Sequence, residues 1–245
     1  KNNDNRNIRF RLNYRGTSLQ LDSASWGEAR YEAGKREYTL RDKHWDNGEI
    51  KITLVSFLAA EGGIWKFTAT GFEAPVKIEA LICETTTNKM VRNGDIGNFR
   101  NPKQFDAPDN PQHLQSVSLT LGGKTAQYFL LEDTRLTTDK PAVLAKRYEQ
   151  ADAARSAFAS TVEFNTPDPY LNPIGGAMVM AADGAWDGTV WTHGAVGWRM
   201  PLPGWRAAYM GDFLGMPDRQ RIHFTAYGNS QVTDVPATIS HPTQD

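Results

Sequence analysis

The stretch EIKITLVSFLAAEGGIWKFTATGF, residues 49–72, decides how the first half of this chain folds. Apolar and polar residues alternate through parts of EIKITLVSFL (49–58) and through IWKFTATGF (64–72). In a β-strand, side chains point alternately to the two faces, so this alternation places apolar side chains toward a core and polar ones toward solvent. Glu61-Gly62-Gly63 separates the two runs, and glycine tolerates the positive φ of tight turns. The stretch therefore predicts two antiparallel strands joined as a hairpin.

The same alternation continues on both sides of this hairpin. It recurs in IRFRLNY (8–14), VKIEALIC (76–83), LQSVSLTL (114–121) and TAQYFLL (125–131). Turn sequences separate the runs: Asp46-Asn47-Gly48, Asn93-Gly94-Asp95 and Gly122-Gly123. Several short strands at this spacing predict an antiparallel β-sandwich over residues 1–138.

The chain changes character near residue 140. Thr138-Asp139-Lys140-Pro141 has the composition of a helix start, and good helix formers follow it. We therefore predict a linker helix over residues 139–162 that lies against another surface. The side chains expected on its buried side are Val143, Leu144, Tyr148, Ala151 and Phe158.

Residues 163–245 are expected to be α-helical. Three prolines exclude a helix from FNTPDPYLNP (164–173), and the next segment, IGGAMVMAADGAW (174–186), is apolar on every side. A helix without a polar face is expected to be buried all round. Shorter helices are predicted over 206–215 and from Pro217 to about Val232. The predicted fold class is thus α+β, a β-sandwich followed by a linker helix and a few further helices.

The balance of acidic and basic residues limits the kinds of macromolecule that this chain is expected to bind. The 245 residues carry 27 basic and 28 acidic side chains, so no electrostatic reason exists to expect nucleic acid or an anionic membrane. No apolar stretch approaches the length of a membrane span. The single cysteine, Cys83, excludes an intrachain disulfide. The polar start without Met is typical of an exported chain with its signal removed, which predicts a periplasmic or extracellular location.

Two segments of the second half carry a family resemblance. Thr166-Pro167-Asp168-Pro169-Tyr170-Leu171-Asn172 with the small-residue helix after it, and GWRAAYMGDFLGMPDR (204–219), resemble the six-hairpin glycosidases. They also resemble an uncharacterised domain-of-unknown-function family of glycan-degrading bacteria. The resemblance implies a galactose-mutarotase-like super-sandwich, a linker helix and the start of an (α/α)6 barrel. It implies the N-terminal part of a glycoside hydrolase that acts on, or binds, a complex glycan, without catalysis by this chain alone.

Residues 186–205 hold four of the seven tryptophans, separated by glycines and prolines. An indole face matches the C–H patch of a sugar, and charged groups beside it take the hydroxyls. The predicted substrate-binding residues are Trp186, Trp191, His193, Trp198, Arg199, Trp205 and Arg206. The alternative is that these rings only pack in a core or in a seam between domains.

The sequence patterns that would indicate catalysis or metal binding are weaker than those for sugar binding. Inverting glycosidases use two carboxylates, and Asp187 and Asp212 stand in the most ligand-like surroundings, although we favour hydroxyl binding over proton donation for them. The five histidines lack metal-ligand spacing, so no cofactor is expected. The Asp-rich loop 93–110 is the one candidate for a structural calcium ion.

Two other functions remain open at this stage. The chain is either a non-catalytic carbohydrate-binding accessory module or a structural module. In the structural case, the apolar helix and the Trp-rich segment would pack on the missing C-terminal barrel or on a second copy.

Overall fold

The computed structural model describes residues 6–58, 60–84, 113–123, 125–192 and 209–231. The chain divides into two compact units, residues 1–155 and residues 156–245. The division falls inside helix α1, which runs Pro141–Ala159. The described strands all lie in the first unit, and helices α2 and α4 lie in the second.

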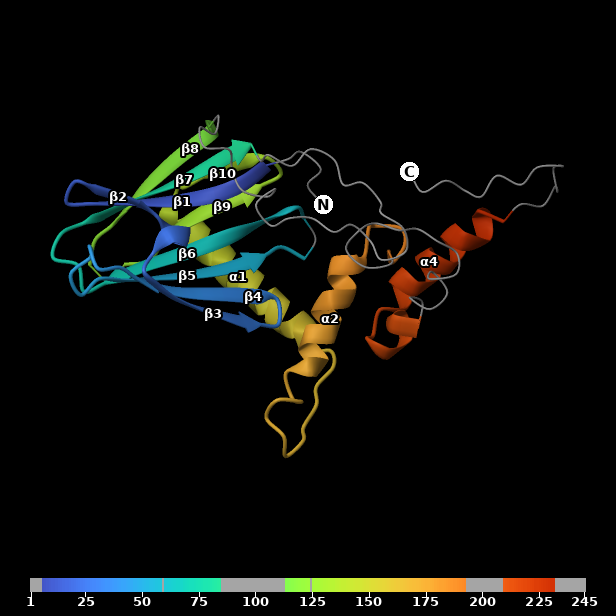
Figure 1. The fold of residues 1–245 in the computed structure, drawn as a ribbon. Helices are drawn as coiled ribbons and strands as arrows, with labels where there is room; N and C mark the ends of the chain where they lie inside the picture. The colour runs from blue at the N-terminus through green and yellow to red at the C-terminus, as the bar shows by residue number, and fades with distance from the viewer. Residues whose placement is uncertain (1–5, 59, 85–112, 124, 193–208, 232–245) are drawn as a thin grey trace, which may run out of the picture. The chain divides into compact units, whose positions relative to one another are not determined.

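Two antiparallel sheets form the first unit (Figure 1). The four-stranded sheet has the order β2-β1-β7-β8, with bounds Thr17–Gln20, Arg6–Tyr14, Val76–Glu84 and His113–Leu121. The six-stranded sheet has the order β10-β9-β6-β5-β4-β3, with bounds Arg135–Thr137, Gln127–Glu132, Gly62–Thr70, Glu49–Ser56, Lys35–Arg41 and Trp26–Glu32. One 3₁₀ turn, η1 (Leu21–Ser23), follows β2. The mixed α+β class and its two antiparallel sheets followed by helices agree with the sequence prediction.

The predicted hairpin over residues 49–72 is confirmed as β5 and β6. Ser56 pairs with Gly63, and the register continues to Glu49 opposite Thr70. The inward-facing side chains of both strands join one core with those of the four-stranded sheet. At its centre, Phe67 packs 5.0 Å from Phe10 and 5.4 Å from Phe129, measured between ring centroids. Burial of these apolar side chains is the main source of the sandwich's stability.

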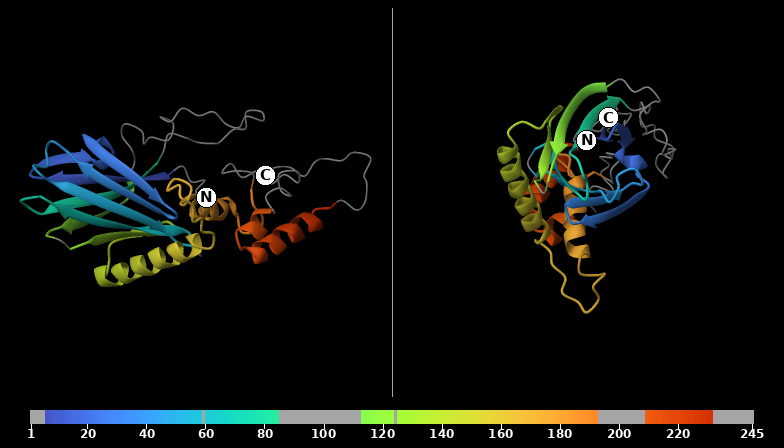
Figure 2. Two further views of the ribbon diagram at one scale, coloured as in Figure 1. Left: turned by 90° about the horizontal axis from the view of Figure 1, so that it is seen from below. Right: turned by 90° about the vertical axis from the view of Figure 1, so that its left-hand side faces the viewer.

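Helix α1 covers part of the other face of the six-stranded sheet (Figure 2). Leu144, Tyr148 and Ala151 pack on a second apolar cluster that includes Val55 and Ile64. This confirms the prediction that the helix lies against another surface. The expected place of Val143 on that buried side is wrong, because its side chain is 58% exposed. Its position in the first turn puts it around the helix from Leu144.

A buried carboxylate fixes the loop between β4 and β5. The Oδ2 of Asp42 accepts a hydrogen bond from the backbone N–H of Ser25 at 2.9 Å. Its Oδ1 accepts the backbone N–H of His44 at 2.9 Å and lies 2.6 Å from the Nδ1 of the same residue. Burial alone raises the pKa of Asp42, but the hydrogen bonds from His44 and Ser25 outweigh it and lower the pKa from 3.8 to about 2.

This carboxylate predicts a loss of stability in acid. Because its pKa is lower in the folded chain than in the unfolded chain, the stabilisation is complete above pH 3.8 and disappears as the pH falls to about 2. We expect a decrease of about 1–2 kcal/mol in the free energy of unfolding across that interval. Urea unfolding at a series of pH values measures it. Asp42→Asn, which cannot ionise, should lose this part of the pH dependence; an identical profile in both proteins would contradict the assignment.

The second unit contains α2 (Ile174–Ala185) and α4 (Pro217–Asn229). Helix α2 confirms the predicted helix over 174–186, but the expectation that it is buried all round is wrong. Gly175, Val179, Met180 and Ala182 are buried, whereas Met178 is 46% exposed. Burial is therefore confined to part of the helix surface. Among the described residues, no helix is long and apolar enough to cross a membrane.

Candidate functional site

The structure describes only part of the predicted substrate-binding set. Trp186, Asp187, Trp191 and Asp212 lie within the described residues. Five others lie outside them: His193, Trp198, Arg199, Trp205 and Arg206.

Trp191 is a core residue of the second unit. Its side chain is 0% exposed, and its indole N–H donates a hydrogen bond of 3.1 Å to the carbonyl of Ala182 in α2. Its backbone N–H donates to Nδ1 of His223 in α4 at 3.1 Å, and this histidine is also fully buried. The ring therefore ties the two helices together. A fully buried indole presents no face to a sugar, so Trp191 does not enter our candidate site.

Trp186 packs beside this core in a half-buried position. Its ring centroid lies 5.0 Å from that of Trp191, in an edge-to-face arrangement. The guanidinium carbon of Arg219 lies 5.6 Å from the centroid of the Trp186 ring, and its Nη2 donates to Oδ1 of Asp183 at 2.9 Å. The pairing of Arg219 with Asp183 could not be predicted from the sequence, because 36 positions separate them along the chain. Their ion pair links α2 to α4.

The two candidate catalytic carboxylates both have local structural partners. Oδ1 of Asp187 accepts the backbone N–H groups of Thr189 and Val190, each at 2.8 Å, as an aspartate does at the start of a tight turn. Oδ2 of Asp212 accepts a hydrogen bond of 3.0 Å from the side chain of Gln220. Their predicted roles in hydroxyl binding or proton transfer stay predictions.

Side chains that can bind a metal ion do not cluster in the part of the chain that the structure describes. Across those residues, no three His, Cys, Asp or Glu side chains are arranged so that they could hold a metal ion. The calcium candidate, loop 93–110, lies outside the described residues, so it stays untested.

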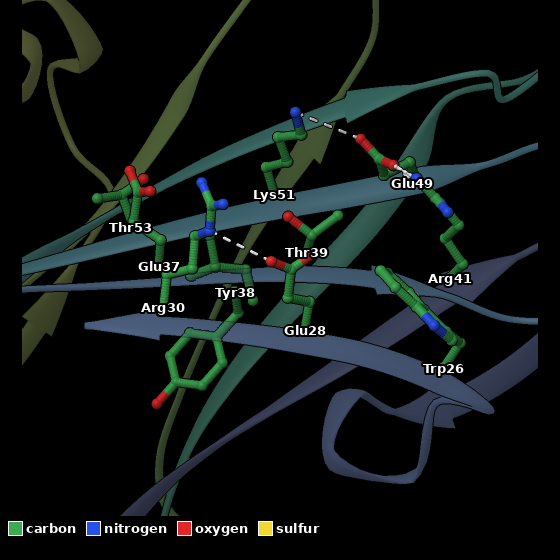
Figure 3. Close-up of a pocket in the computed structure, with 11 residues that line it drawn as sticks. Trp26, Glu28, Arg30, Glu37, Tyr38, Thr39, Arg41, Glu49, Lys51 and Thr53 are labelled. Atoms are coloured by element: carbon green, nitrogen blue, oxygen red, sulfur yellow. Dashed lines mark hydrogen bonds and ion pairs between the residues drawn. The ribbon is translucent and has the colours of Figure 1, made fainter. Parts of the chain in front are cut away.

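A different site lies on the six-stranded sheet of the first unit. We call the face turned away from the four-stranded sheet its outer face. Alternation along the strands puts Val55 and Ile64 on this face beneath α1, while the outer positions of β3, β4 and the first half of β5 lie beside the helix. There the sheet carries polar and charged side chains around a hollow of about 400 Å³. We call it the sheet-face hollow (Figure 3).

Strand register builds this hollow in rows across three strands. Trp26, Arg41 and Glu49 form one row, because Trp26 pairs with Arg41 and Arg41 with Glu49. The next row is Glu28, Thr39 and Lys51, and the third is Arg30, Glu37 and Thr53. Figure 3 shows Trp26, Glu28 and Arg30 following one another along β3.

The first row is held in place by direct contacts. The guanidinium carbon of Arg41 lies 4.6 Å from the centroid of the Trp26 ring. The Nε of Arg41 donates to Oε2 of Glu49 at 2.9 Å, and Nζ of Lys51 lies 3.6 Å from Oε1 of the same carboxylate. Hydrogen bonding from Arg41 keeps the pKa of Glu49 below its ordinary value, against a smaller opposing effect of burial. Glu49 is therefore ionised at neutral pH, and the Trp26 ring, 42% exposed, is fixed beside it.

The remaining rows add groups that can donate and accept hydrogen bonds. Arg30 Nε lies 3.2 Å from Oε1 of Glu28 on the same strand. Thr39 and Thr53 supply hydroxyls between the charged side chains. Three acidic and three basic residues line the hollow: Glu28, Glu37, Glu49, Arg30, Arg41 and Lys51. Charged groups and hydroxyls thus alternate across the hollow, an arrangement that can form several hydrogen bonds with a polar ligand.

The hollow was not predicted from the sequence, because strands β3 and β4 were not predicted. The segments WGEARYE and KREYTLR alternate, but their outer positions are mostly charged and the inner positions of β3 are Gly27, Ala29 and Tyr31. Such segments lack the apolar face by which the other strands are found. Two signals were available: Trp26, an aromatic residue followed by alternating charges, and Gly34, whose φ of 80° serves the two-residue turn between β3 and β4.

Comparison with known proteins gives one family. No curated protein matches the chain. A family model described as "Domain of unknown function (DUF4450)" matches residues 5–154, which include every described strand and all residues of the sheet-face hollow. With more than half of its 245 residues matched, the chain belongs to the DUF4450 family.

Proposed function

We propose that this chain is a carbohydrate-binding part of a glycan-processing protein, and that its β-sandwich binds the glycan in the sheet-face hollow. The observation that carries the proposal is Trp26. This partly exposed indole stands at one end of a hollow whose other walls are carboxylates, guanidinium groups and hydroxyls. A sugar offers the matching surfaces, with C–H groups on one face and hydroxyls around its edge.

Ion pairs on the sheet prepare the hollow for binding. Arg41 donates two hydrogen bonds to the partly buried carboxylate of Glu49, so its side chain has lost much of its rotamer freedom before a ligand arrives. Pre-ordered side chains lower the entropic penalty of binding. Carboxylates accept hydrogen bonds from sugar hydroxyls, while guanidinium and ammonium groups donate to their oxygens.

The charge balance of the hollow favours a neutral glycan. Its three acidic and three basic side chains leave no net positive field. A sulfated or uronic-acid polymer needs such a field to offset the loss of its own hydration. We therefore propose a neutral oligosaccharide or polysaccharide as the ligand class.

The resemblance over 166–172 and 204–219 extends this proposal to the whole protein. In a six-hairpin glycosidase, a sandwich that binds the polysaccharide would keep this substrate near the helical part, where hydrolysis takes place. We propose this arrangement in an exported protein, with binding assigned to this chain and hydrolysis assigned elsewhere.

Removing the exposed indole should weaken glycan binding. We expect Trp26→Ala to raise the Kd for a neutral glycan, selected on a glycan array, at least tenfold, or about 1.4 kcal/mol. Isothermal titration measures the change. Tyr31→Ala is the matched control, because Tyr31 is an exposed aromatic residue of the same strand but faces the other side of the sheet. Equal affinities for Trp26→Ala and the wild-type protein, or no binding to any neutral glycan on the array, would contradict the proposal.

A structural role is the second candidate, and exposed apolar side chains of the second unit favour it. Tyr170 is 85% exposed and Phe213 80%. Apolar surface of this kind is typical of a face that packs on another protein domain. Crosslinking or co-purification with the C-terminal part of the full-length protein tests this role, and a loss of that association in Phe213→Ser would support it.

A further inference from the structure

Strand β3 is an open edge of the six-stranded sheet. Its only neighbour among the described strands is β4, and all seven of its residues, Trp26–Glu32, are exposed (Figure 1). The other edge strands, β2, β8 and β10, each contain partly buried or buried residues in their described parts. One side of β3 therefore presents backbone N–H and C=O groups to solvent, which is a template for pairing with another strand.

The sequence of β3 is complementary to itself when one copy runs antiparallel to another. A two-fold axis through Ala29 places Glu28 opposite Arg30 of the second copy, and Arg30 opposite Glu28 of the second copy. Both residues lie on the outer face, where they already pair with each other within one chain at 3.2 Å, so a second copy would extend this pair into a cluster of four alternating charges across the seam. On the inner face, Gly27 would lie opposite Tyr31, and the small glycine leaves room for the ring.

The order of charges along β3 also argues against a role that only protects the edge from pairing with another strand. Edge strands are often protected by charged side chains such as lysine, which disfavour pairing with another strand. The outer positions of β3 alternate in sign instead, Glu28 then Arg30 then Glu32, and the antiparallel register turns this alternation into attraction. The chemistry of the edge thus identifies the partner as another copy of the same strand.

We propose that two copies of this chain associate through β3, so that their six-stranded sheets form one continuous antiparallel sheet about a two-fold axis. Such an axis stands perpendicular to the sheet and keeps both outer faces on the same side. The two sheet-face hollows then lie side by side across the β3 seam. This inference does not rest on the proposed glycan binding; if both hold, the dimer presents two adjacent sites and gains avidity for a long glycan.

The test is the mass of the protein in solution, measured by light scattering without glycan. We expect the wild-type chain to have twice the mass of one chain at tens of micromolar concentration. In Arg30→Glu, each cross-strand pair becomes Glu opposite Glu, and in Glu28→Arg it becomes Arg opposite Arg. Each of these variants is expected to be monomeric, with at least a tenfold rise in the dimer dissociation constant.

Mixing the two variants should restore association, because the two acidic side chains at these positions in one chain then face the two basic side chains of the other. The double exchange, Glu28→Arg with Arg30→Glu, should also remain dimeric. Thermal unfolding of each variant confirms that the fold is kept, and Lys51→Glu, a charge reversal in the same hollow on β5, should leave the dimer intact. A monomeric wild-type chain, a dimer indifferent to Arg30→Glu, or a dimer lost in Phe213→Ser would overturn the proposal.

Discussion

Trp191→Ala is expected to destabilise the second unit by about 3–5 kcal/mol, the largest effect of any substitution considered. Its side chain is fully buried, so alanine leaves a cavity where a bicyclic ring contacted Trp186 and His223. The substitution also removes the indole N–H that donates to the carbonyl of Ala182. Both losses fall on the contact between α2 and α4.

Chemical unfolding followed by circular dichroism and tryptophan fluorescence measures this effect. Because the chain has two compact units, we expect the helical transition to move to lower denaturant while the sandwich transition stays in place. Tyr209→Ala is the control, since Tyr209 is an exposed aromatic residue of the same unit. Unchanged unfolding of Trp191→Ala would show that the ring is not part of this core.

Arg155→Ala should destabilise the first unit by about 2–4 kcal/mol. The Arg155 side chain is 6% exposed; its Nε donates to the carbonyl of Ser56 at 2.8 Å and its Nη2 to that of Phe57 at 2.6 Å. These bonds fasten α1 to the end of β5. Alanine removes a donor from each carbonyl and leaves a cavity in the packing between helix and sheet.

The matched control for this substitution lies two turns earlier on the same helix. Arg147 is partly exposed, bonds to Glu132, and its guanidinium carbon lies 4.8 Å from the centroid of the Phe57 ring. Exposed ion pairs contribute at most about 1 kcal/mol, so Arg147→Ala should shift the urea midpoint much less. Equal shifts in the two variants would mean that the buried hydrogen bonds of Arg155 do not hold the helix.

The strands predicted from the sequence are those with an apolar face. β5 and β6 alternate clearly because Ile50, Ile52 and Phe67 must reach the shared core. β3 could not be found in this way, since all its residues are exposed and the inner positions Gly27 and Ala29 have little apolar surface. Its strand state is set by pairing with β4 across a two-residue turn, a hairpin contact that the propensities of single residues do not encode.

The helices and the site show the same limit. Composition located α1 and α2, but it could not determine how far each helix is covered, so Val143 and Met178 were wrongly expected to be buried. A cluster of tryptophans in a glycine-rich segment also does not distinguish a ligand-binding ring from a core ring. Trp191 is buried because α4, more than 25 residues later, supplies His223 beneath it.

The sheet-face hollow depends on register across three strands. Trp26, Arg41 and Glu49 lie on three consecutive strands and meet only when β3, β4 and β5 pair in the observed register. Taken one at a time in the sequence, the acidic and basic residues of the hollow do not differ from other charged surface residues. Their joint arrangement becomes visible only in the folded sheet.

The most direct test of the account is a nuclear magnetic resonance titration that follows the indole N–H signals of the seven tryptophans. Trp26→Phe assigns the Trp26 signal, and Trp191→Phe assigns that of Trp191. As a neutral oligosaccharide chosen on a glycan array is added, the Trp26 signal should shift and that of Trp191 should stay still. A titration that shifts tryptophans of residues 186–205 and leaves Trp26 unmoved would contradict a glycan site on the sheet.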